Sequence, residues 1–350
     1  MNEALTFDDV LIVPRFSDIK SRKDCSLKSI IKINGTLEFH LGIPIIASNM
    51  DTICEVKMAR KMAELGGMGI LHRNMSIANL ALAILSLEED KKTAVVAVGG
   101  IHTDKEKIDY LMNRGVVLCV DMANGHSQNM KETLEYICQK SHPVIIAGNV
   151  CTPLGVQNLH AWGADIVKVG VGSGSVCTTR IKTGCGYPQL QAIMDIVKET
   201  RGNIPIIADG GIRTPGDAAK ALAAGANFVM LGGMLAATDC TPYWGVVDGS
   251  KRKDLRSGPG GFGIRIPFRG MASESAKGHK THVEGEEVYM EEKSEGSTKA
   301  VIDDICDGIR SAMSYVGAHN LKEFWHFSDF VRVTNAVHIE NQPHKIYDVD

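Results

Sequence analysis

The sequence predicts an α/β protein built on a (β/α)8 barrel, the TIM-barrel fold. Eight short runs rich in Val, Ile and Ala are typical of parallel strands that are buried on both faces. Helix-like stretches separate most of these runs, and this alternation favours a parallel sheet covered by helices. Eight strands favour a closed barrel, and no GxGxxG pattern follows the first run, which counts against an open dinucleotide-binding sheet.

The strands and helices are expected in regular order along the chain. The strands should cover residues 43–49, 68–72, 94–99, 116–122, 144–150, 166–171, 204–208 and 228–231. The helices between them should include residues 55–65, 105–114, 127–139, 154–161, 189–200 and 216–224. Pro215 stands where the first turn of a helix tolerates proline, and Gly225 stands where a helix stop is expected.

The alternation ends after the eighth strand. Residues 240–297 are rich in Gly, Lys, Arg and Glu, and an irregular segment of this length indicates either disorder or function. Because it follows the last strand, it would lie at the carboxyl rim of the barrel, where barrel active sites are found. We therefore expect a long flap here, with helical pattern resuming at 299–315, and one catalytic domain over residues 1–350.

Composition and charge exclude several classes of protein. The net charge is −3, so no global basic field exists that could hold a nucleic-acid backbone. No apolar run reaches the roughly 18 residues of a membrane span, and the start of the chain does not resemble a secretory signal. The nine cysteines are scattered without a CxxC pair, which argues against a zinc site or a disulfide framework. We expect a cytoplasmic protein that binds neither nucleic acid nor membrane.

The most informative stretch is residues 169–188, VGVGSGSVCTTRIKTGCGYP. A strand ends near its start, and Gly172, Gly174 and Ser175 then form a loop in which backbone N–H groups can cradle an anion. Cys177 lies in this loop, where a polar surrounding suits a nucleophilic thiol. The alternative is a structural cysteine in a tight turn. The position at the carboxyl end of a barrel strand favours the nucleophile.

Glycine pairs follow the seventh and eighth expected strands. Gly210 and Gly211 end the run IIADGG, and Gly232 and Gly233 lie within FVMLGGM. The loops after these two strands commonly bind phosphate in barrels, although such glycines could also serve tight turns alone. Asp209, directly before the first pair, would point to the ligand side and could accept hydrogen bonds from two ribose hydroxyls.

Polar residues also follow other expected strands on the same rim. Asn49 and Asp51 follow the first strand, Arg73 the second, Asp121 the fourth and Asn149 the fifth. Any one of them could cap a helix. Their gathering on one rim from several strands is what a barrel active site requires.

A carboxylate on the flap is the last candidate. Glu284 lies in the run HVEGEE, and a closing flap could carry it onto the reacting centre. A glutamate in a charged loop is usually only solvated, so the pattern by itself does not favour Glu284 over its neighbours.

Four motifs in order, GSGSVCTTR, IIADGGI, FVMLGGM and RGMAS, resemble those of the IMP dehydrogenase/GMP reductase family, and the resemblance covers nearly the whole chain. Several features are similar to the reductase branch. HRNMS leads into a short connection, without the CBS modules that the dehydrogenases usually insert there. The residues between Gly270 and Glu284 lack the adjacent Arg–Tyr pair that activates water in the dehydrogenases. Arg73 departs from this pattern, because many reductases have lysine there.

The resemblance implies a reaction and roles for individual residues. Cys177 would add to C2 of the GMP purine and ammonia would leave, after which NADPH would deliver hydride to give IMP. Thr179 and Glu284 would relay the proton that the amino group needs in order to leave as ammonia. Glu295 is the alternative position for this flap glutamate when the flap is aligned with the family. The resemblance also implies a homotetramer, and a potassium ion held by the backbone carbonyls of Gly172, Gly174 and Cys177.

The remaining implied contacts divide between substrate and cofactor. The residues expected to hold the nucleotide are Ser175, Asp209, Gly210, Gly211, Gly232, Gly233, Met271, Ser273 and Gly285. The residues expected beside the cofactor are Asn49, Arg73, Asp121 and Asn149. Three alternatives stay open: a dehydrogenase without CBS modules that converts IMP with NAD⁺, a catalytically silent nucleotide-binding barrel, and a different phosphate-binding barrel isomerase.

Overall fold

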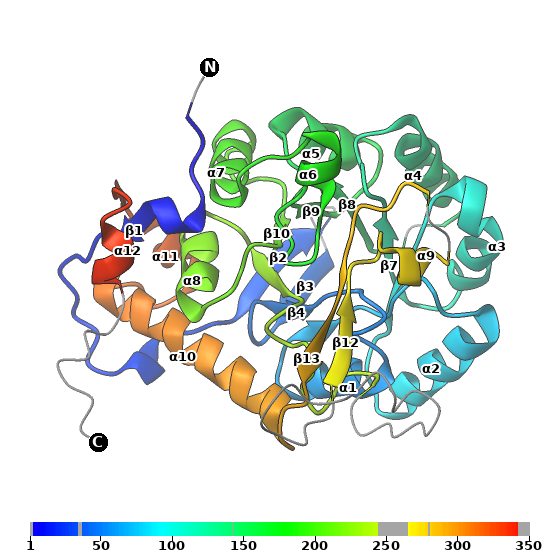
Figure 1. The fold of residues 1–350 in the computed structure, drawn as a ribbon, viewed down its shortest axis with the longest axis horizontal. Helices are drawn as coiled ribbons and strands as arrows, with labels where there is room; N and C mark the ends of the chain where they lie inside the picture. The colour runs from blue at the N-terminus through cyan, green and yellow to red at the C-terminus, as the bar shows by residue number, and fades with distance from the viewer. Residues whose placement is uncertain (1–2, 34–36, 142, 244–264, 279–280, 342–350) are drawn as a thin grey trace.

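The computed structural model describes residues 3–33, 37–141, 143–243, 265–278 and 281–341. Its centre is a parallel sheet of eight strands in the order β5-β4-β11-β10-β9-β8-β7-β6, surrounded by helices (Figure 1). The two ends of this order meet at Leu71. Its amide donates to the Val95 carbonyl at 2.8 Å, and its carbonyl accepts from the Ala97 amide at 2.8 Å. The sheet therefore closes, and the predicted (β/α)8 barrel is confirmed.

All eight predicted strands are present at the predicted places. They are β4 (Ile45–Ala47), β5 (Met68–Gly69), β6 (Val95–Val98), β7 (Val117–Asp121), β8 (Ile145–Val150), β9 (Ile166–Val169), β10 (Ile206–Asp209) and β11 (Phe228–Leu231). Their side chains are buried almost throughout. Burial on both faces explains why these strands show as continuous apolar runs.

The helices between the strands also follow the prediction, with two differences. They are α1 (Val56–Glu64), α2 (Ile77–Glu89), α3 (Ile101–Leu111), α4 (Gln128–Lys140), α5 (Pro153–Ala161), α7 (Gln189–Thr200) and α8 (Pro215–Ala223). Helix α3 begins at Ile101 rather than 105, because non-helical backbone at Asp104 separates its first turn from the periodic part. Helix α2 was not among the predicted helices, and its exposed Leu82 and Leu85 show why: both faces are apolar.

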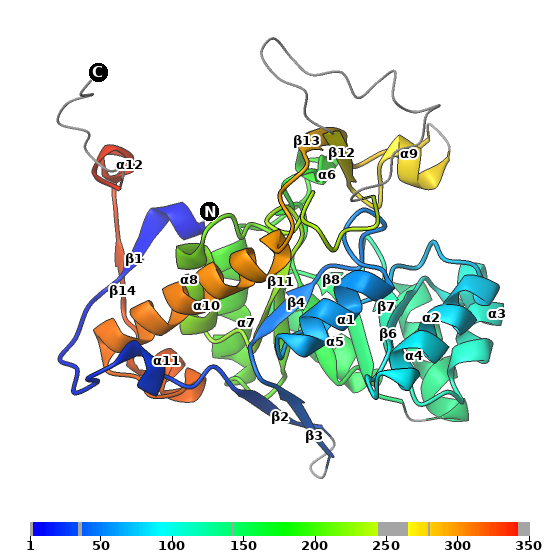
Figure 2. The same ribbon diagram turned by 90° about the horizontal axis from the view of Figure 1, so that it is seen from below.

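A hairpin that the sequence did not predict fills the amino end of the barrel. Strands β2 (Ser29–Ile33) and β3 (Leu37–Leu41) pair antiparallel. Ile31 and Ile33 are buried among side chains of the barrel interior, and the rings of Phe39 and Phe228 meet edge to face at 6.0 Å. Figure 2 shows this hairpin at the end of the molecule opposite to β12 and β13. Only the carboxyl end is left for a ligand site.

The expected irregular flap is instead largely ordered where the structure describes it. Strand β12 (Arg265–Arg269) pairs antiparallel with β13 (Glu287–Glu291), and the short helix α9 (Glu274–Lys277) lies between them in sequence. Ile266 and Phe268 are buried while their neighbours are half-buried, an alternation that the Gly- and charge-rich composition hid. The chain at Cys240 and Thr241 is still buried in the body, so the flap begins later than 240. Residues 244–264 and 279–280 of the predicted flap lie outside the described residues.

Both ends of the chain pack against the outside of the barrel. Helix α10 (Ser297–Val316) confirms the predicted helix, and it is followed by α11 (Leu321–Phe327), β14 (Phe330–Arg332) and α12 (Val337–Glu340). β1 (Val10–Ile12) pairs with β14, preceded by the turn η1 (Phe7–Asp9) and followed by the turn η2 (Arg22–Asp24). Within the described ranges, no helix has the length and apolar character needed to cross a bilayer.

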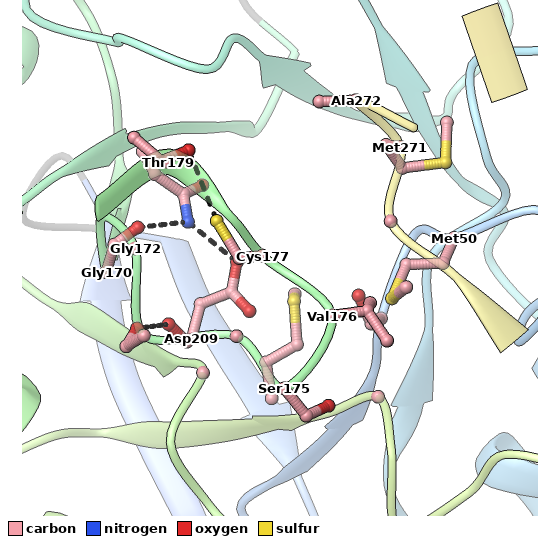
Figure 3. Close-up of a pocket in the computed structure, with 18 of the residues that line it drawn as sticks. Met50, Gly170, Gly172, Ser175, Val176, Cys177, Thr179, Asp209, Met271 and Ala272 are labelled. Atoms are coloured by element: carbon pink, nitrogen blue, oxygen red, sulfur yellow. Dashed lines mark hydrogen bonds between the residues drawn. The ribbon is translucent and has the colours of Figure 1, made fainter. Parts of the chain in front are cut away.

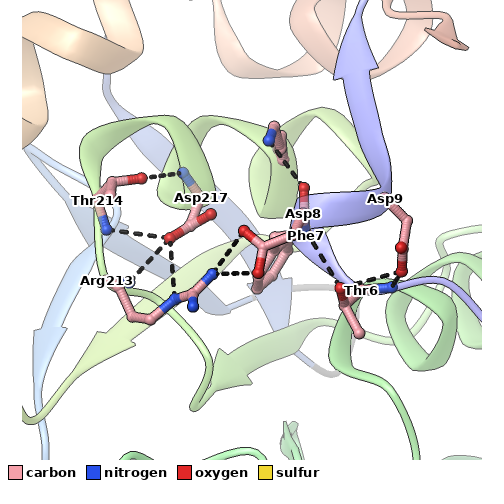
Figure 4. Close-up of polar contacts among 8 residues, drawn as sticks. Thr6, Phe7, Asp8, Asp9, Arg213, Thr214 and Asp217 are labelled. Carbon is pink, nitrogen blue, oxygen red and sulfur yellow. Dashed lines mark hydrogen bonds and ion pairs between the residues drawn. The ribbon is translucent and has the colours of Figure 1, made fainter. Parts of the chain in front are cut away.

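The N-terminal segment fixes the loop after β10 (Figure 4). Arg213 donates two hydrogen bonds of 2.6 Å to the Asp8 carboxylate, and Lys220 donates to the Phe7 carbonyl at 2.8 Å. Asp217 and Thr214 form a capping box at the start of α8. The loop that carries the first glycine pair is thus held between the N-terminal segment and α8.

Candidate active site

A cavity opens at the carboxyl end of the barrel strands, bounded by their loops and by the flap. Every residue predicted to touch substrate, cofactor or ion lines it except Ser273 and Gly285, and the rim candidate Asp51 does not line it. The predicted residues that line it are Asn49, Arg73, Asp121, Asn149, Gly172, Gly174, Ser175, Cys177, Thr179, Asp209, Gly210, Gly211, Gly232, Gly233, Met271 and Glu284. Figure 3 shows Met50, Met271 and Ala272 across the cavity from Gly170 and Gly172. The predicted residues named here therefore lie around one cavity.

A chain of side chains joins the cysteine loop to the flap. The Cys177 thiol donates to Thr179 Oγ1 at 3.2 Å, and the Thr179 hydroxyl donates to Glu284 Oε2 at 2.8 Å. The cysteine loop continues into the short helix α6 (Thr179–Thr183), which begins at the same threonine. Both hydrogen bonds therefore run in the same direction, from the thiol toward the carboxylate. The arrangement can carry a proton from the thiol to Glu284.

Backbone hydrogen bonds hold the flap against this loop. The Thr178 amide donates to the Glu284 carbonyl at 2.9 Å, and the Glu286 amide donates to the Val176 carbonyl at 2.9 Å. Gly285, between them, comes so close to the chain that a Cβ there would lie 3.0 Å from the Ser273 nitrogen. Glu295, the rival in the flap alignment, is exposed in the turn before α10 and does not line the cavity.

Cys177 differs from the buried cysteines of the barrel. It is half-buried and lines the cavity, whereas Cys54 and Cys119 are fully buried. Burial raises the pKa of the Cys119 thiol to about 12, so this thiol stays protonated and unreactive at neutral pH. Cys54 is affected in the same direction, again through burial. Exposure to the cavity therefore singles out Cys177 within the barrel.

Three polar groups of the cavity floor converge on a lysine that the sequence interpretation missed. Lys168 on β9 donates to Asp121 Oδ1 at 2.8 Å, Asn49 Oδ1 at 3.1 Å and Asp209 Oδ2 at 3.4 Å. Burial alone would raise the pKa of Asp121, but the Lys168 ammonium and the Arg73 guanidinium together lower it. The only available signal was a lysine inside the apolar run IVKV, which the strand pattern absorbed.

The predicted phosphate loops have the close approaches that require glycine. Gly210 has a φ of +99°, and a Cβ there would lie 2.5 Å from Ser173 Oγ. The hydroxyl of Ser175 lies 3.0 Å from the position of a Cβ on Gly233, so the cysteine loop and the second glycine pair face each other. Backbone amides and one hydroxyl are thereby gathered in a small space, which suits an anion.

Comparisons with known proteins agree with this geometry. Residues 4–344 match a family model described as the IMP dehydrogenase / GMP reductase domain. The chain belongs to the IMP dehydrogenase / GMP reductase family. It is 37% identical over 343 residues to human GMP reductase 1, with 94% of this chain and 95% of that protein covered. It is 38% identical to the GMP reductases of Aeromonas hydrophila and Vibrio cholerae, with 94% of each chain covered. As a member of this family, the protein is an enzyme and an oxidoreductase.

The two predicted family residues outside the cavity have structural contacts. The Ser273 hydroxyl accepts from the Ala276 amide at 3.3 Å and so caps α9, and the residue is 2% exposed. Gly285 forms isolated bridges with Cys177 and Ser273. Both residues shape the backbone that presents Met271 and Glu284 to the cavity.

An ion pair fastens the flap to the barrel. Arg269, at the end of β12, donates through Nε and Nη2 to the two carboxylate oxygens of Asp51 at 3.1 and 2.7 Å. Asn74 donates to the same carboxylate at 3.2 Å. The Asp51 side chain is 8% exposed and that of Arg269 19% exposed, so solvent screens the pair little. Such a fork on a carboxylate fixes orientation as well as distance.

We expect Arg269→Gln to lower kcat by roughly 10- to 100-fold with a smaller change in KM. The reason is that Glu284 would no longer be held against Thr179, and small misplacements in an active site cost about this much. Arg265→Gln is the matched control, since Arg265 lies on the same strand face. Steady-state kinetics of both variants measure the effect. Equal rates for the two variants would show that the ion pair does not position the flap.

Proposed function

We propose that the protein is a GMP reductase, which converts GMP to IMP and ammonia with NADPH as reductant in purine nucleotide salvage. The observation that carries the proposal is the hydrogen-bonded chain from Cys177 through Thr179 to Glu284 at the cavity. The relatives named GMP reductase support the choice within the family. The absence of an Arg–Tyr pair from residues 271–283 disfavours a dehydrogenase that activates water there.

The mechanism begins with the thiol. The Cys177 proton passes to Thr179 while the threonine proton passes to Glu284, and the sulfur bonds to C2 of the purine. Glu284 then protonates the amino group through the same relay, and ammonia leaves when the C2–N bond breaks. The result is a thioimidate between Cys177 and the purine. Positioned proton transfer of this kind contributes about 10²–10⁴-fold to the rate.

The second half replaces sulfur with hydrogen. NADPH, when bound, would supply a hydride to C2. Breaking of the C2–S bond would then release IMP and leave the Cys177 thiolate, which regains its proton from water. The cavity contains a group that fits an amide N–H donor such as the nicotinamide carboxamide. Asn149 Oδ1 is buried and accepts no hydrogen bond from the described residues, while its Nδ2 donates to Asp209 and to the Gly170 carbonyl. Arg73, Asp121 and Asn49 line the same cavity and would lie beside the cofactor.

The nucleotide would lie between the two glycine pairs. Asp209 would accept hydrogen bonds from the ribose, and Ser175, Gly211, Gly232 and Gly233 would surround the 5′-phosphate. Met271 would contact the base from the flap side. Gly210 and Gly285 would serve by allowing close approach, and Ser273 by fixing the flap backbone.

We include a potassium ion in the proposal as a structural ligand of the cysteine loop. The carbonyls of Gly172, Gly174 and Cys177 would hold it, and carbonyl oxygens are groups that can replace the hydration shell of K⁺. The donor set fits, because the Gly174 carbonyl accepts the Cys177 amide at 3.1 Å and keeps its second lone pair. No step of the reaction passes through the ion. We further propose a cytoplasmic homotetramer with one catalytic domain per chain, acting on nucleotide without nucleic-acid or membrane partners.

The deciding experiment compares two mixtures with purified protein. One contains GMP and NADPH, and the other contains IMP and NAD⁺, the substrates of the dehydrogenase alternative that Arg73 favours. We expect the absorbance of the reduced nicotinamide to fall in the first mixture, with IMP and ammonia as products. A rise in the second mixture alone would make the protein a dehydrogenase. No change in either would support a silent nucleotide-binding barrel.

A further inference from the structure

The ammonium group of Lys168 lies beneath the cavity rather than in it. Lys168 is 2% exposed and is one of the largest fully buried side chains in the described part of the chain. It extends from β9 toward the floor of the cavity, where its three partners stand on different elements: Asn49 after β4, Asp121 on β7 and Asp209 on β10. All three partners line the cavity, and Lys168 does not.

Strand β8 comes very close to β9 at Lys168. The neighbouring residue on β8 is Gly148, and a Cβ there would lie 2.6 Å from Lys168 Cβ and 2.7 Å from its carbonyl oxygen. Any other residue at position 148 would push β8 and β9 apart. A buried ammonium is expensive in free energy unless it is well paired and hydrogen-bonded. Apolar side chains fill the barrel interior below it, so packing alone does not call for a lysine at this level.

The charges of the floor depend on this one cation. Lys168 lies between two carboxylates, and the three groups together carry a net charge of −1. The groups that act on Asp121 are Lys168 from β9, Arg73 from the loop after β5 and Asn49 after β4, with Cys119 on its own strand, and Asp209 from β10 shares the Lys168 ammonium. Without Lys168, two partly buried carboxylates would remain around one cavity floor, where like charge favours uptake of a proton.

We propose that Lys168 is a positioning residue that holds the carboxylates of Asp209 and Asp121 in a fixed orientation, and so couples the ribose side of the cavity to the cofactor side. This inference rests on the proposed function for the identity of the ligands. Asp209 is held from two directions, by Lys168 and by the Asn149 amide at 2.8 Å. Asp121 receives its shortest side-chain hydrogen bond, of 2.8 Å, from Lys168. One ammonium thus sets the direction of both carboxylates.

The test measures equilibrium binding of GMP and of NADPH by calorimetry, from weakly acidic to weakly basic pH. The variants are Lys168→Met, Lys168→Arg and the control Lys140→Met, whose lysine contacts Asp109 and Tyr136 outside the cavity. We expect Lys168→Met to bind GMP roughly 10- to 100-fold more weakly at neutral pH, since charge-assisted contacts are worth about this much. Lys168→Arg should restore part of the affinity, and Lys140→Met should bind like wild type.

The pH profile separates positioning from a purely structural role. In wild type, Lys168 and Arg73 keep the pKa of Asp121 low, so this carboxylate stays ionised throughout the range and adds nothing to the pH dependence that the GMP phosphate itself brings. In Lys168→Met the pKa of a floor carboxylate rises, so affinity should fall as pH falls through that raised value and recover at higher pH. A structural defect would weaken binding equally at all pH values. An affinity and pH profile equal to wild type would overturn the proposal.

A second variant covers the case in which Lys168→Met does not fold. Lys168→Met with Asp121→Asn keeps the net floor charge at −1 and removes the repulsion, so it should fold. We expect it to bind GMP with the pH profile of wild type but more weakly. If the double variant binds GMP as tightly as wild type, the proposal that Lys168 couples the ribose side of the cavity to the cofactor side is wrong. Because the readout is binding, a wild-type protein that binds GMP without turnover would refute the proposed function alone, and one that binds no purine nucleotide would refute both.

Discussion

Replacing Cys177 by alanine is expected to lower GMP turnover by about 10⁴-fold or more, while GMP binding stays within a few-fold of wild type. The sulfur forms the covalent bond to C2 in the proposed mechanism, and loss of a nucleophile leaves only the catalysis that binding supplies. Binding should persist because the nucleotide contacts come from Asp209, Ser175 and the glycine pairs. Steady-state rates and calorimetric binding of GMP measure the two effects.

Cys185→Ala is the matched control for this prediction. Cys185 follows α6 in the same segment and is exposed, and its thiol contacts only the Thr183 carbonyl among the described residues. Its loss should leave turnover unchanged. In addition, an electrophile such as iodoacetamide should label Cys177 in wild type, and GMP should protect it. Turnover near the wild-type rate in Cys177→Ala would exclude the covalent mechanism.

The sequence predicted those parts of the fold in which local pattern and tertiary structure agree. The eight barrel strands are buried on both faces, so each appears as an apolar run wherever it lies in the barrel. The hairpin of β2 and β3 was not predicted, because its alternation of buried and exposed residues is short. Its role, which is to close the amino end of the barrel, is visible only in three dimensions. The flap strands escaped because only Ile266 and Phe268 mark them within a charged segment.

The site residues also divide into those that the sequence predicts and those that it does not. Residues at strand ends, such as Asp209 and Asn149, were predictable because a barrel brings all carboxyl ends to one rim. Lys168 was not, because its role depends on partners 41 to 119 positions away in the chain. Glu284 could be named only from the resemblance, since the local pattern HVEGEE contains three glutamates of equal appearance. Its hydrogen bond to Thr179 supplies the physical reason that the sequence lacked.

Glu284→Gln is expected to lower the rate of ammonia release by roughly 10²–10⁴-fold, with GMP binding changed only a few-fold. Glutamine fills the same space and can still accept a hydrogen bond from Thr179, but it cannot take up and return a proton. Because the amino group leaves poorly without a proton, the step that breaks the C2–N bond should suffer most. Rapid-quench measurement of ammonia in a single turnover reports this step directly.

The leaving group separates proton transfer from mere positioning of the flap. In a GMP analogue with chlorine in place of the 2-amino group, the leaving group is chloride. Chloride needs no proton in order to leave. We expect Glu284→Gln to lose clearly less of its rate on this analogue than on GMP, because the analogue still needs the proton to be taken from Cys177 but does not need it to be returned to the leaving group. Glu295→Gln is the control, because Glu295 is exposed before α10 and should react like wild type with both substrates. Equal losses on GMP and the chloro analogue would mean that Glu284 does not protonate the leaving amino group, and a loss confined to Glu295→Gln would transfer the proton relay to that residue.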